Sequence, residues 1–390
     1  MPEAVSSAER TARRPRAPVT RPAWLRLPEQ PMARHLVLGV LASAALFAVS
    51  MAVGSYNDYQ LAQIGINAVA IAGLSVLVGT NGQISLGQGA FVMVGAYGAG
   101  LVLVHTKLPV ALALVVAVAA SGAFGVVIGV PASRLRGPYL AGMTLALAIG
   151  LPAVTIKYRG VFNGEEGLSI NPLVPPGGVD PQRWLSWVVL ASVVALLVLV
   201  ANVLRSRFGR AFRAVRDDEV AAALVGISVA RTQVLAFAVS SACAGLAGGL
   251  LGLATGIVNP GGFSIVLSIS LLAGMVVGGT GSIVGAWWGA ALLVYVPQWS
   301  STIANHLGLQ SGQSSNVALL FYGAVLVVVM LVAPSGIQGG LQRALAALSR
   351  RPAAASGSGR GAGVVAARQP VGATQVSSGL PEDELPGGSG

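Results

Sequence analysis

Charged residues are scarce in this chain. Only 9% of its 390 residues are Asp, Glu, Lys or Arg, whereas 54% are hydrophobic. Soluble domains carry about 25% charged residues, and a water-soluble chain of this length could not cover its surface with so few. The composition therefore excludes a soluble globular protein and indicates one that lies in a membrane.

Cysteine and histidine are also rare. Cys243 is the only cysteine, so a disulfide within the chain is excluded, and its place in an apolar run suits a small side chain that fills space. The histidines His35, His105 and His306 fall in loops or at the ends of apolar runs. We therefore predict no metal site.

Lysine occurs only at positions 107 and 157. A phosphate-binding loop of the Gly-Lys-Ser/Thr type needs a glycine before its lysine, but these two lysines follow Thr106 and Ile156. We therefore expect the chain to bind no ATP and no other cofactor itself, and not to be an enzyme. If it moves a solute uphill, the energy must come from another subunit.

Long apolar runs recur along the sequence. About 20 apolar residues cross the ~30 Å hydrocarbon layer as a helix, and lipid offers the backbone no hydrogen-bond partner, so the spans must be helical. The runs are continuous and not alternating, which excludes a β-barrel. We predict ten spans, at residues 36–54, 61–78, 89–104, 110–131, 139–156, 184–204, 232–256, 263–277, 282–299 and 316–332.

The net charge of +11 follows the predicted topology. Seven arginines precede residue 36, two lie in 132–138, six in 205–231 and five after residue 333; the other side keeps Lys107, Lys157, Arg159 and Arg183. Basic residues mark the cytoplasmic side of membrane proteins, so both termini are predicted to be cytoplasmic. Because topology accounts for the charge, we expect no nucleic acid as a partner.

The chain divides into a transmembrane domain, 36–333, and two flanking regions. Residues 1–35 mix Arg with Pro and residues 334–390 are rich in Gly, Ala and Ser; both are predicted to be disordered cytoplasmic tails. The external loop 157–183 contains GEEG and PPGG, which favour turns over packed secondary structure. The fold class is an all-α polytopic membrane protein with about ten helices.

None of the ten spans has Asp, Glu, Lys or Arg in its interior. Ion- and proton-coupled carriers commonly use such groups within the membrane, and haem proteins usually place histidines there. Uncharged spans suit a cargo without net charge. They leave the chain no visible means of coupling transport to protons.

The cytoplasmic loop 205–231 contains a short capped helix by prediction. Asp217 suits the N-cap, Asp218 and Glu219 suit the positive end of the helix dipole, and Gly226 suits the position just past the end. A helix of about two turns is unstable in isolation, so we expect it to dock on a partner. The alternative is a solvated loop whose arginines only set topology.

Glycines occur in two distinct settings. Gly245, Gly248, Gly249, Gly252 and Gly256 repeat at intervals of four, which is typical of closely packed helices. Residues 79–89 and 279–285 instead concentrate glycines at cytoplasmic span ends, where broken or re-entrant backbone is tolerated if it is buried or lines a cavity. They either line or gate a pathway or form simple tight turns. The pathway candidates are Asn81, Gly82, Gln83, Ser85, Gly87, Gln88, Gly279, Thr280, Gly281 and Ser282.

The segment EVAAALVG at 219–226 resembles the EAA coupling loop of ABC-importer permeases, with Val220 inserted. GRAFRAVRDDEVAA at 209–222 is similar to the loop of branched-chain amino acid permeases. Further stretches agree with the LivM branch of that family. They are NGQISLGQGAF (81–91), LRGPYLAGMTLA (135–146), GGTGSIVG (278–285) and LVAPSGI (331–337). The segment FNGEEGL at 162–168 departs from the usual Thr-Gly-Gly pattern, which leaves the substrate open.

The resemblance implies an importer permease of the prokaryotic inner membrane for branched-chain or other neutral amino acids. Its partners would be membrane lipid, a second homologous permease, an extracytoplasmic solute-binding protein and two ATP-binding cassette subunits that carry ATP and Mg. The coupling residues would be Asp217, Asp218, Glu219, Ala221, Ala222 and Gly226. The alternatives are a permease for another small neutral solute such as an amide or urea, a stand-alone solute channel, and a membrane assembly factor.

Overall fold

Apolar helices form nearly all of the regular structure in this chain. The computed structural model describes residues 55–106, 108–170 and 180–306, with short pieces at 323–324, 327–328, 336–340 and 343. They all belong to one unit, Met1–Leu345. The predicted span 36–54 and the tail 1–35 lie outside the described residues, as do most of the span 316–332 and of the tail 334–390.

The other eight predicted spans coincide with helices. Six of these are long and apolar enough to cross a membrane, and a seventh, α11, is a shorter apolar helix. The all-α polytopic class is therefore confirmed. The helices are α2 (Ser55–Leu74), which continues as the π-helix η2 (Ser75–Thr80), α3 (Gln88–His105), α4 (Val110–Ala132), α5 (Pro138–Lys157), α7 (Pro181–Arg205), α10 (Val229–Thr255), α11 (Ile265–Gly278) and α12 (Ile283–His306).

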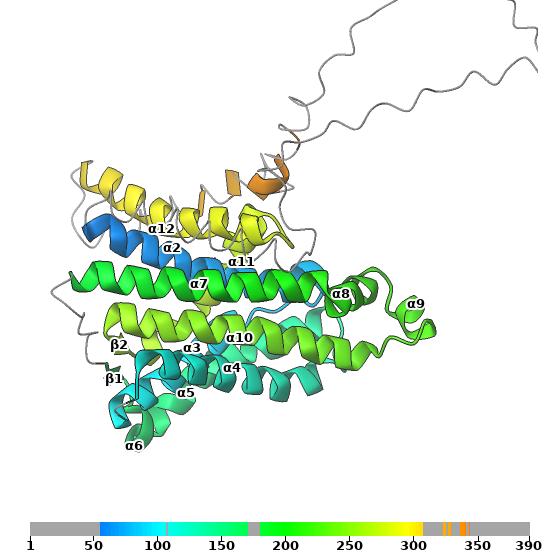
Figure 1. Ribbon diagram of the computed structural model, residues 1–390, viewed down its shortest axis with the longest axis horizontal. Coiled ribbons are helices and arrows are strands. Elements are labelled where there is room, and N and C mark those ends of the chain that lie inside the picture. The colour runs from blue at the N-terminus through cyan, green and yellow to red at the C-terminus, as the bar shows by residue number, and fades with distance from the viewer. Residues whose placement is uncertain are drawn as a thin grey trace, which may run out of the picture. The chain divides into compact units, whose positions relative to one another are not determined.

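The helices lie side by side and differ in how far they are enclosed (Figure 1). The spans formed by α2 with η2, α3 and α10 are 61–78% buried, whereas those of α4, α5 and α7 are only 22–33% buried. Phe91 of α3 lies near the middle of the core, with its ring edge-on to Phe237 of α10 and to Phe124 of α4. The inner helices thus pack on protein, and the outer helices present apolar surface such as Val115 and Val127.

The glycine repeat of α10 serves close packing, as predicted. A Cβ atom at Gly248 would lie 1.9 Å from the carbonyl oxygen of Val92 on α3, and one at Gly245 would lie 2.5 Å from the carbonyl oxygen of Ala117 on α4. Both distances are far inside van der Waals contact. Gly256 differs from the others, because it ends α10 in the left-handed conformation.

The outer loop is more ordered than its composition predicted. It contains a one-turn helix, α6 (Arg159–Phe162), and a strand, β1 (Leu168–Ser169), that pairs antiparallel with β2 (Ile257–Val258). The ring of Phe162 packs on Tyr97, and Leu168 is buried. The expected turn forms at GEEG (164–167), and PPGG (175–178) lies outside the described residues. The helix and the strand on either side of GEEG were not expected, and they form because apolar residues among the turn formers pack onto the helix ends.

A buried carboxylate lies at the start of the first membrane-length helix that the structure describes. The candidate span that includes α2 begins at Asp58, three residues before the predicted start, and this side chain is fully buried. Its Oδ2 lies 3.4 Å from Nε of Arg183 at the start of α7. Asp58 lies outside the predicted span 61–78, whose interior holds no charged residue, and its ion pair joins helices 125 residues apart in sequence.

Candidate coupling and gating site

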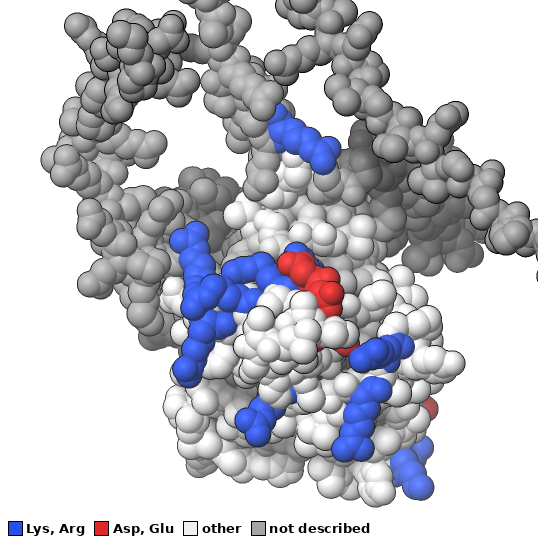
Figure 2. Space-filling model, turned by 90° about the vertical axis from the view of Figure 1, so that its right-hand side faces the viewer, with Lys and Arg blue, Asp and Glu red and all other residues white. Residues whose placement is uncertain are grey.

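The segments predicted to be cytoplasmic come together at one end of the bundle. Arg136 from the loop after α4 forms an ion pair with Glu219, and Arg216 hydrogen-bonds the carbonyl oxygen of Gly79. Figure 2 views this end and shows basic side chains around a small acidic patch. The exposed arginines in these segments are Arg134, Arg136, Arg205, Arg207, Arg210, Arg213, Arg216 and Arg231.

A helix that the sequence analysis treated as a basic loop follows α7. It is α8 (Arg207–Asp217), and the Ser206 hydroxyl caps its start by accepting from the amide of Phe208. Its buried residues are Gly209, Phe212 and Val215, while its arginines are exposed. This spacing of three was the signal for an amphipathic helix, and the density of arginines concealed it.

The predicted short helix is α9 (Glu219–Leu224), with a different N-cap residue. Oδ1 of Asp218 accepts hydrogen bonds from the amides of Val220 (2.8 Å) and Ala221 (3.0 Å). Asp217, the predicted cap, instead ends α8 and forms an ion pair with Arg216. The predicted end is correct, since Gly226 follows the helix with a positive φ of 85°.

The exposed face of α9 is apolar. Val220, Leu224 and Val225 are 68%, 84% and 76% exposed. Ala221 is exposed too, whereas Ala222 is only 3% exposed and faces its own chain. A docking partner would therefore contact the exposed valines and leucine, and Ala222 would hold α9 on the bundle.

Glu219 fixes α9 to two neighbouring segments. Its Oε1 accepts a hydrogen bond from Nε2 of Gln233 on α10 (3.0 Å), and its Oε2 lies 3.3 Å from Nη2 of Arg136. The sequence indicated only a role at the helix dipole. Gln233 and Arg136 were missed because no local pattern connects them to residue 219.

The first glycine segment, residues 79–89, lies at the end of a membrane-length helix as predicted and leads from η2 into α3. The α2 helix widens into η2, where the amide of Asn81 bonds the carbonyl of Val76 at 3.2 Å, and Gly82 then takes a positive φ of 79°. Asn81, Gln83 and Ser85 are buried although the segment is not helical. Polar side chains thus occupy the interior where the backbone is broken.

Hydrogen bonds from four helices hold the end of this segment. The amide of Leu86 donates to the hydroxyl of Thr144 on α5, and that of Gly89 donates to Ser268 on α11, both at 2.9 Å. Gln88 bonds Ala70 of α2 through Nε2 (3.1 Å), and its Oε1 accepts from Ser240 of α10 (3.4 Å). All four partner residues lie in spans whose sequence showed only an apolar pattern.

The two glycine segments, 200 residues apart in sequence, meet in the structure. A Cβ atom at Gly79 would lie 2.3 Å from the amide nitrogen of Gly281, so the backbones touch. Gly279 and Gly281 both have positive φ, and the Ser282 hydroxyl accepts from the amide of Gly285 at the start of α12 (3.1 Å). Thr280 is exposed beside this contact.

Arg216 connects the helices α8 and α9 with the glycine segments. Its Nη1 donates to the carbonyl oxygen of Gly79 (2.9 Å), and its Nε and Nη2 donate to Oδ1 of Asp217 (3.0 and 2.8 Å). Its Cγ would lie 2.9 Å from a Cβ atom at Gly82. A displacement of α9 would therefore be transmitted through the Arg216 side chain to Gly79 at the end of η2.

The arrangement suits mechanical coupling between a peripheral partner and a membrane pathway. Among the described residues, no group of three or more His, Cys, Asp or Glu side chains could hold a metal ion. Long apolar helices, buried polar residues where one of them ends and a small exposed apolar face on α9 are features of a component of a membrane transport machine.

Comparison with known proteins identifies the kind of machine. The chain belongs to the family described as "branched-chain amino acid transport system / permease component", whose model matches residues 56–330. The permease proteins LivM of Salmonella typhimurium and of Escherichia coli K12 are each 31% identical to it, over 77% of this chain and 73% of theirs. LivH of E. coli K12 is 28% identical, over 70% of this chain and 91% of its own.

No solved structure matches the chain. The family and the apolar helices together establish a permease subunit of an ABC importer, with several spans in the bacterial inner membrane. Its relatives are permease subunits of transporters and not enzymes, and as a permease component the chain belongs with other subunits of a transporter.

Proposed function

We propose that this permease imports branched-chain or other neutral amino acids. The relatives named LivM and LivH are high-affinity branched-chain amino acid permeases, and the predicted spans suit a cargo whose backbone charges cancel. It would work with a second homologous permease, two ATP-binding cassette subunits and an extracytoplasmic solute-binding protein. ATP and Mg would be bound by the cassette subunits.

One observation carries the proposed mechanism, namely the path from α9 through Arg216 to Gly79. The apolar face of α9 would sit in a cleft of an ATP-binding subunit, which moves when ATP binds. Because Glu219 holds α9 to α10 and Asp217 holds Arg216, the displacement would be delivered to the two glycine segments. These segments would act as the cytoplasmic gate.

Unpartnered polar atoms support a role for the first glycine segment in the pathway. Nδ2 of Asn81 donates to Oε1 of Gln83 at 2.9 Å, which leaves Oδ1 of Asn81 and Nε2 of Gln83 buried without a hydrogen-bond partner among the described residues. Ser75 Oγ, one helical turn earlier, also has none. Buried polar atoms without partners are rare and costly, and a hydrated or cargo-filled gate would supply partners.

Reconstitution tests the proposal. Vesicles that contain this chain, its related permease and two ATP-binding subunits should take up leucine, isoleucine or valine when the binding protein is outside and ATP is inside. With internal ATP held constant, a protonophore should leave uptake unchanged. Proton-driven accumulation by the chain alone would contradict the proposal, as would ATP-independent flux that marks a stand-alone channel.

The same vesicles distinguish branched-chain amino acids from the alternative cargoes, amides and urea. The departure from the family pattern at residues 162–168 lies in an outer loop that packs against α3 through Phe162. A panel with amides and urea beside the branched-chain amino acids therefore decides between substrates. Uptake of urea or an amide in preference to leucine would retain the importer mechanism and replace the cargo.

A further inference from the structure

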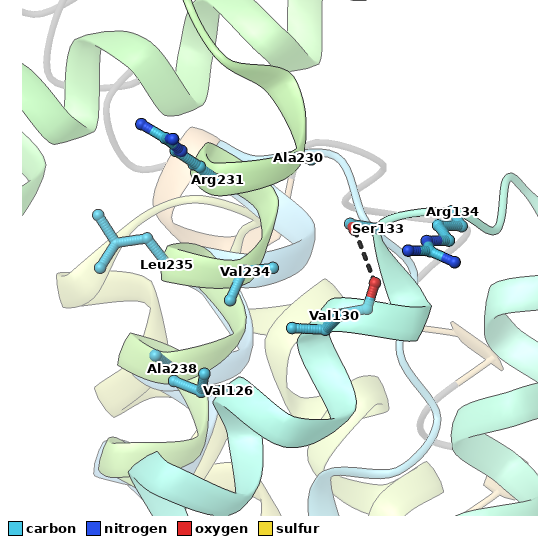
Figure 3. Close-up of a pocket in the computed structure, with 9 residues that line it drawn as sticks. All are labelled: Val126, Val130, Ser133, Arg134, Ala230, Arg231, Val234, Leu235 and Ala238. Carbon is cyan, nitrogen blue, oxygen red and sulfur yellow. Dashed lines mark hydrogen bonds between the residues drawn. The ribbon is translucent and has the colours of Figure 1, made fainter.

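A cavity lies between α4 and α10 at the end of the bundle that carries α8 and α9. Its volume is about 520 Å³, several of its lining residues are exposed, and no residue of the two glycine segments lines it. Figure 3 shows Val126 and Val130 extending from α4 toward Val234 and Ala238 of α10. Its lining is mostly apolar, as expected of a surface in contact with lipid.

Two arginines lie at the cytoplasmic end of this groove, one on each helix. Arg134 follows the end of α4 and Arg231 lies in the first turn of α10 (Figure 3). Both are exposed, and neither forms a salt bridge with any other residue that the structure describes. The groove thus combines an apolar body with uncompensated positive charge at one end.

The dimensions fit one leaflet of a bilayer. From Val126 to Arg134 the chain advances about 12 Å at 1.5 Å per helical residue, and half of the hydrocarbon layer is about 15 Å thick. Arginines at this depth extend their guanidinium groups to the headgroup region while their stems remain in apolar surroundings.

We propose that this groove binds an acidic phospholipid of the cytoplasmic leaflet. Its phosphate would lie at Arg134 and Arg231, and one acyl chain would lie along Val126, Val130 and Val234. Basic pockets between transmembrane helices on the cytoplasmic side favour anionic headgroups. A zwitterionic lipid carries an ammonium group that these two arginines repel.

A second copy of this chain fits the groove less well. At this end of the bundle the acidic residues that the structure describes are Asp217, Asp218 and Glu219, and each is already engaged. Asp217 pairs with Arg216, Asp218 caps α9, and Glu219 bonds Arg136 and Gln233. Charge complementarity therefore favours a lipid phosphate.

Native mass spectrometry of the purified importer tests the site. Dioleoyl phosphatidylglycerol, titrated into delipidated protein, should bind in preference to dioleoyl phosphatidylcholine. The double variant Arg134→Gln, Arg231→Gln should bind phosphatidylglycerol at least about tenfold more weakly, since each basic residue near the surface contributes about 1 kcal/mol. Ala238→Trp, which fills the groove and keeps both charges, should weaken binding too.

The matched control is Arg207→Gln, Arg210→Gln, which removes two exposed arginines of α8 that do not line the groove. It should keep phosphatidylglycerol binding within about twofold of the unmodified protein, as expected for side chains without the contact. Equal loss in this control would mean a general charge effect and would overturn the proposal. Equal binding of phosphatidylcholine would overturn it as well, and so would displacement of the lipid by inorganic phosphate alone. If the only effect of the groove variants were the loss of a protein dimer, the groove would bind a second copy of the chain, and the lipid proposal would be wrong.

Discussion

The guanidinium group of Arg216 donates a hydrogen bond to the carbonyl oxygen of Gly79 across 137 residues of sequence, with Nη1 2.9 Å from the oxygen. The donor lies at the end of the surface helix α8, and the acceptor lies where a membrane helix breaks. The contact therefore joins an exposed surface helix to the segment that we propose as the cytoplasmic gate.

Arg216→Gln should uncouple the two parts. Hydrogen bonds to charged groups contribute about 1.5–3 kcal/mol, and we expect the lower end because this side chain is 42% exposed. ATP-driven uptake should fall roughly tenfold, since 1.4 kcal/mol corresponds to a factor of ten, while the ATP-binding subunits still co-purify. Arg210→Gln, an exposed arginine of the same helix, is the control. Unchanged uptake by Arg216→Gln would refute the coupling role.

Two substitutions in α9 should have different effects. Leu224→Asp places a carboxylate on the exposed face, so the permease should keep its melting temperature and lose the ATP-binding subunits in pull-down. Ala222→Asp buries a carboxylate against the chain itself, which costs several kcal/mol, so it should lower the melting temperature first. Retention of the subunits by Leu224→Asp would place their contact elsewhere.

Gly79→Ala should force the two glycine segments apart. Its Cβ would lie 2.3 Å from the amide nitrogen of Gly281, and overpacking of this kind costs about 1–3 kcal/mol. We expect reduced uptake together with a higher passive leak of leucine from preloaded vesicles. Gly98→Ala, whose Cβ would meet its nearest neighbour at 3.4 Å, should transport normally. A variant at Gly79 with neither defect would show that the contact does not form the gate.

The ion pair of Asp58 and Arg183 should stabilise the outer end of the bundle. Asp58 is fully buried, and removal of one partner of a buried pair costs about 3–5 kcal/mol. The Arg183 side chain is 34% exposed, so we expect Arg183→Gln to lower the free energy of unfolding by an amount at or below the lower end of that range. The double variant Asp58→Asn, Arg183→Gln should recover part of the loss in thermal unfolding. Strictly additive losses would show that the two side chains do not interact.

Cysteine labelling should verify the topology. The native Cys243 is buried, so it gives little background. Pro181→Cys, at the exposed start of α7, should react with an impermeant maleimide in intact cells, and Arg210→Cys should react only after permeabilisation. The reverse pattern would invert the assignment of the basic end to the cytoplasm.

The sequence predicted those features that depend on composition and local pattern. Apolar runs predicted eight of the described helices, and charge asymmetry placed on one side the segments that Arg136, Arg216 and Glu219 join at one end. Gly226 was assigned correctly because the end of α9 requires a positive φ. The short apolar repeat of α8 was missed, because the arginines between its buried residues read as a loop.

Hydrogen-bond partners that are distant in sequence could not be predicted from local pattern. Nothing near Gln88 indicates that it bonds Ala70 and Ser240, and nothing near Arg216 distinguishes it from five other arginines of the same loop. The choice between Asp217 and Asp218 as the N-cap was equally undetermined, since either carboxylate suits that position. It depends on where α8 ends, which is a matter of packing on α7 and α10.

The backbone contacts of α10 restrict how the transporter can change shape. Successive residues of a helix point about 100° apart. A turn of α10 that replaced Gly248 by Ala247 would therefore bring a methyl group to the carbonyl oxygen of Val92, where a Cβ atom at position 248 would lie only 1.9 Å away. We therefore expect α3, α4 and α10 to keep their packing during a transport cycle. We then expect the displacement of a transport cycle to fall on the contact between η2 and the α11–α12 corner, where the backbones of Gly79 and Gly281 meet with no side chain of either residue between them.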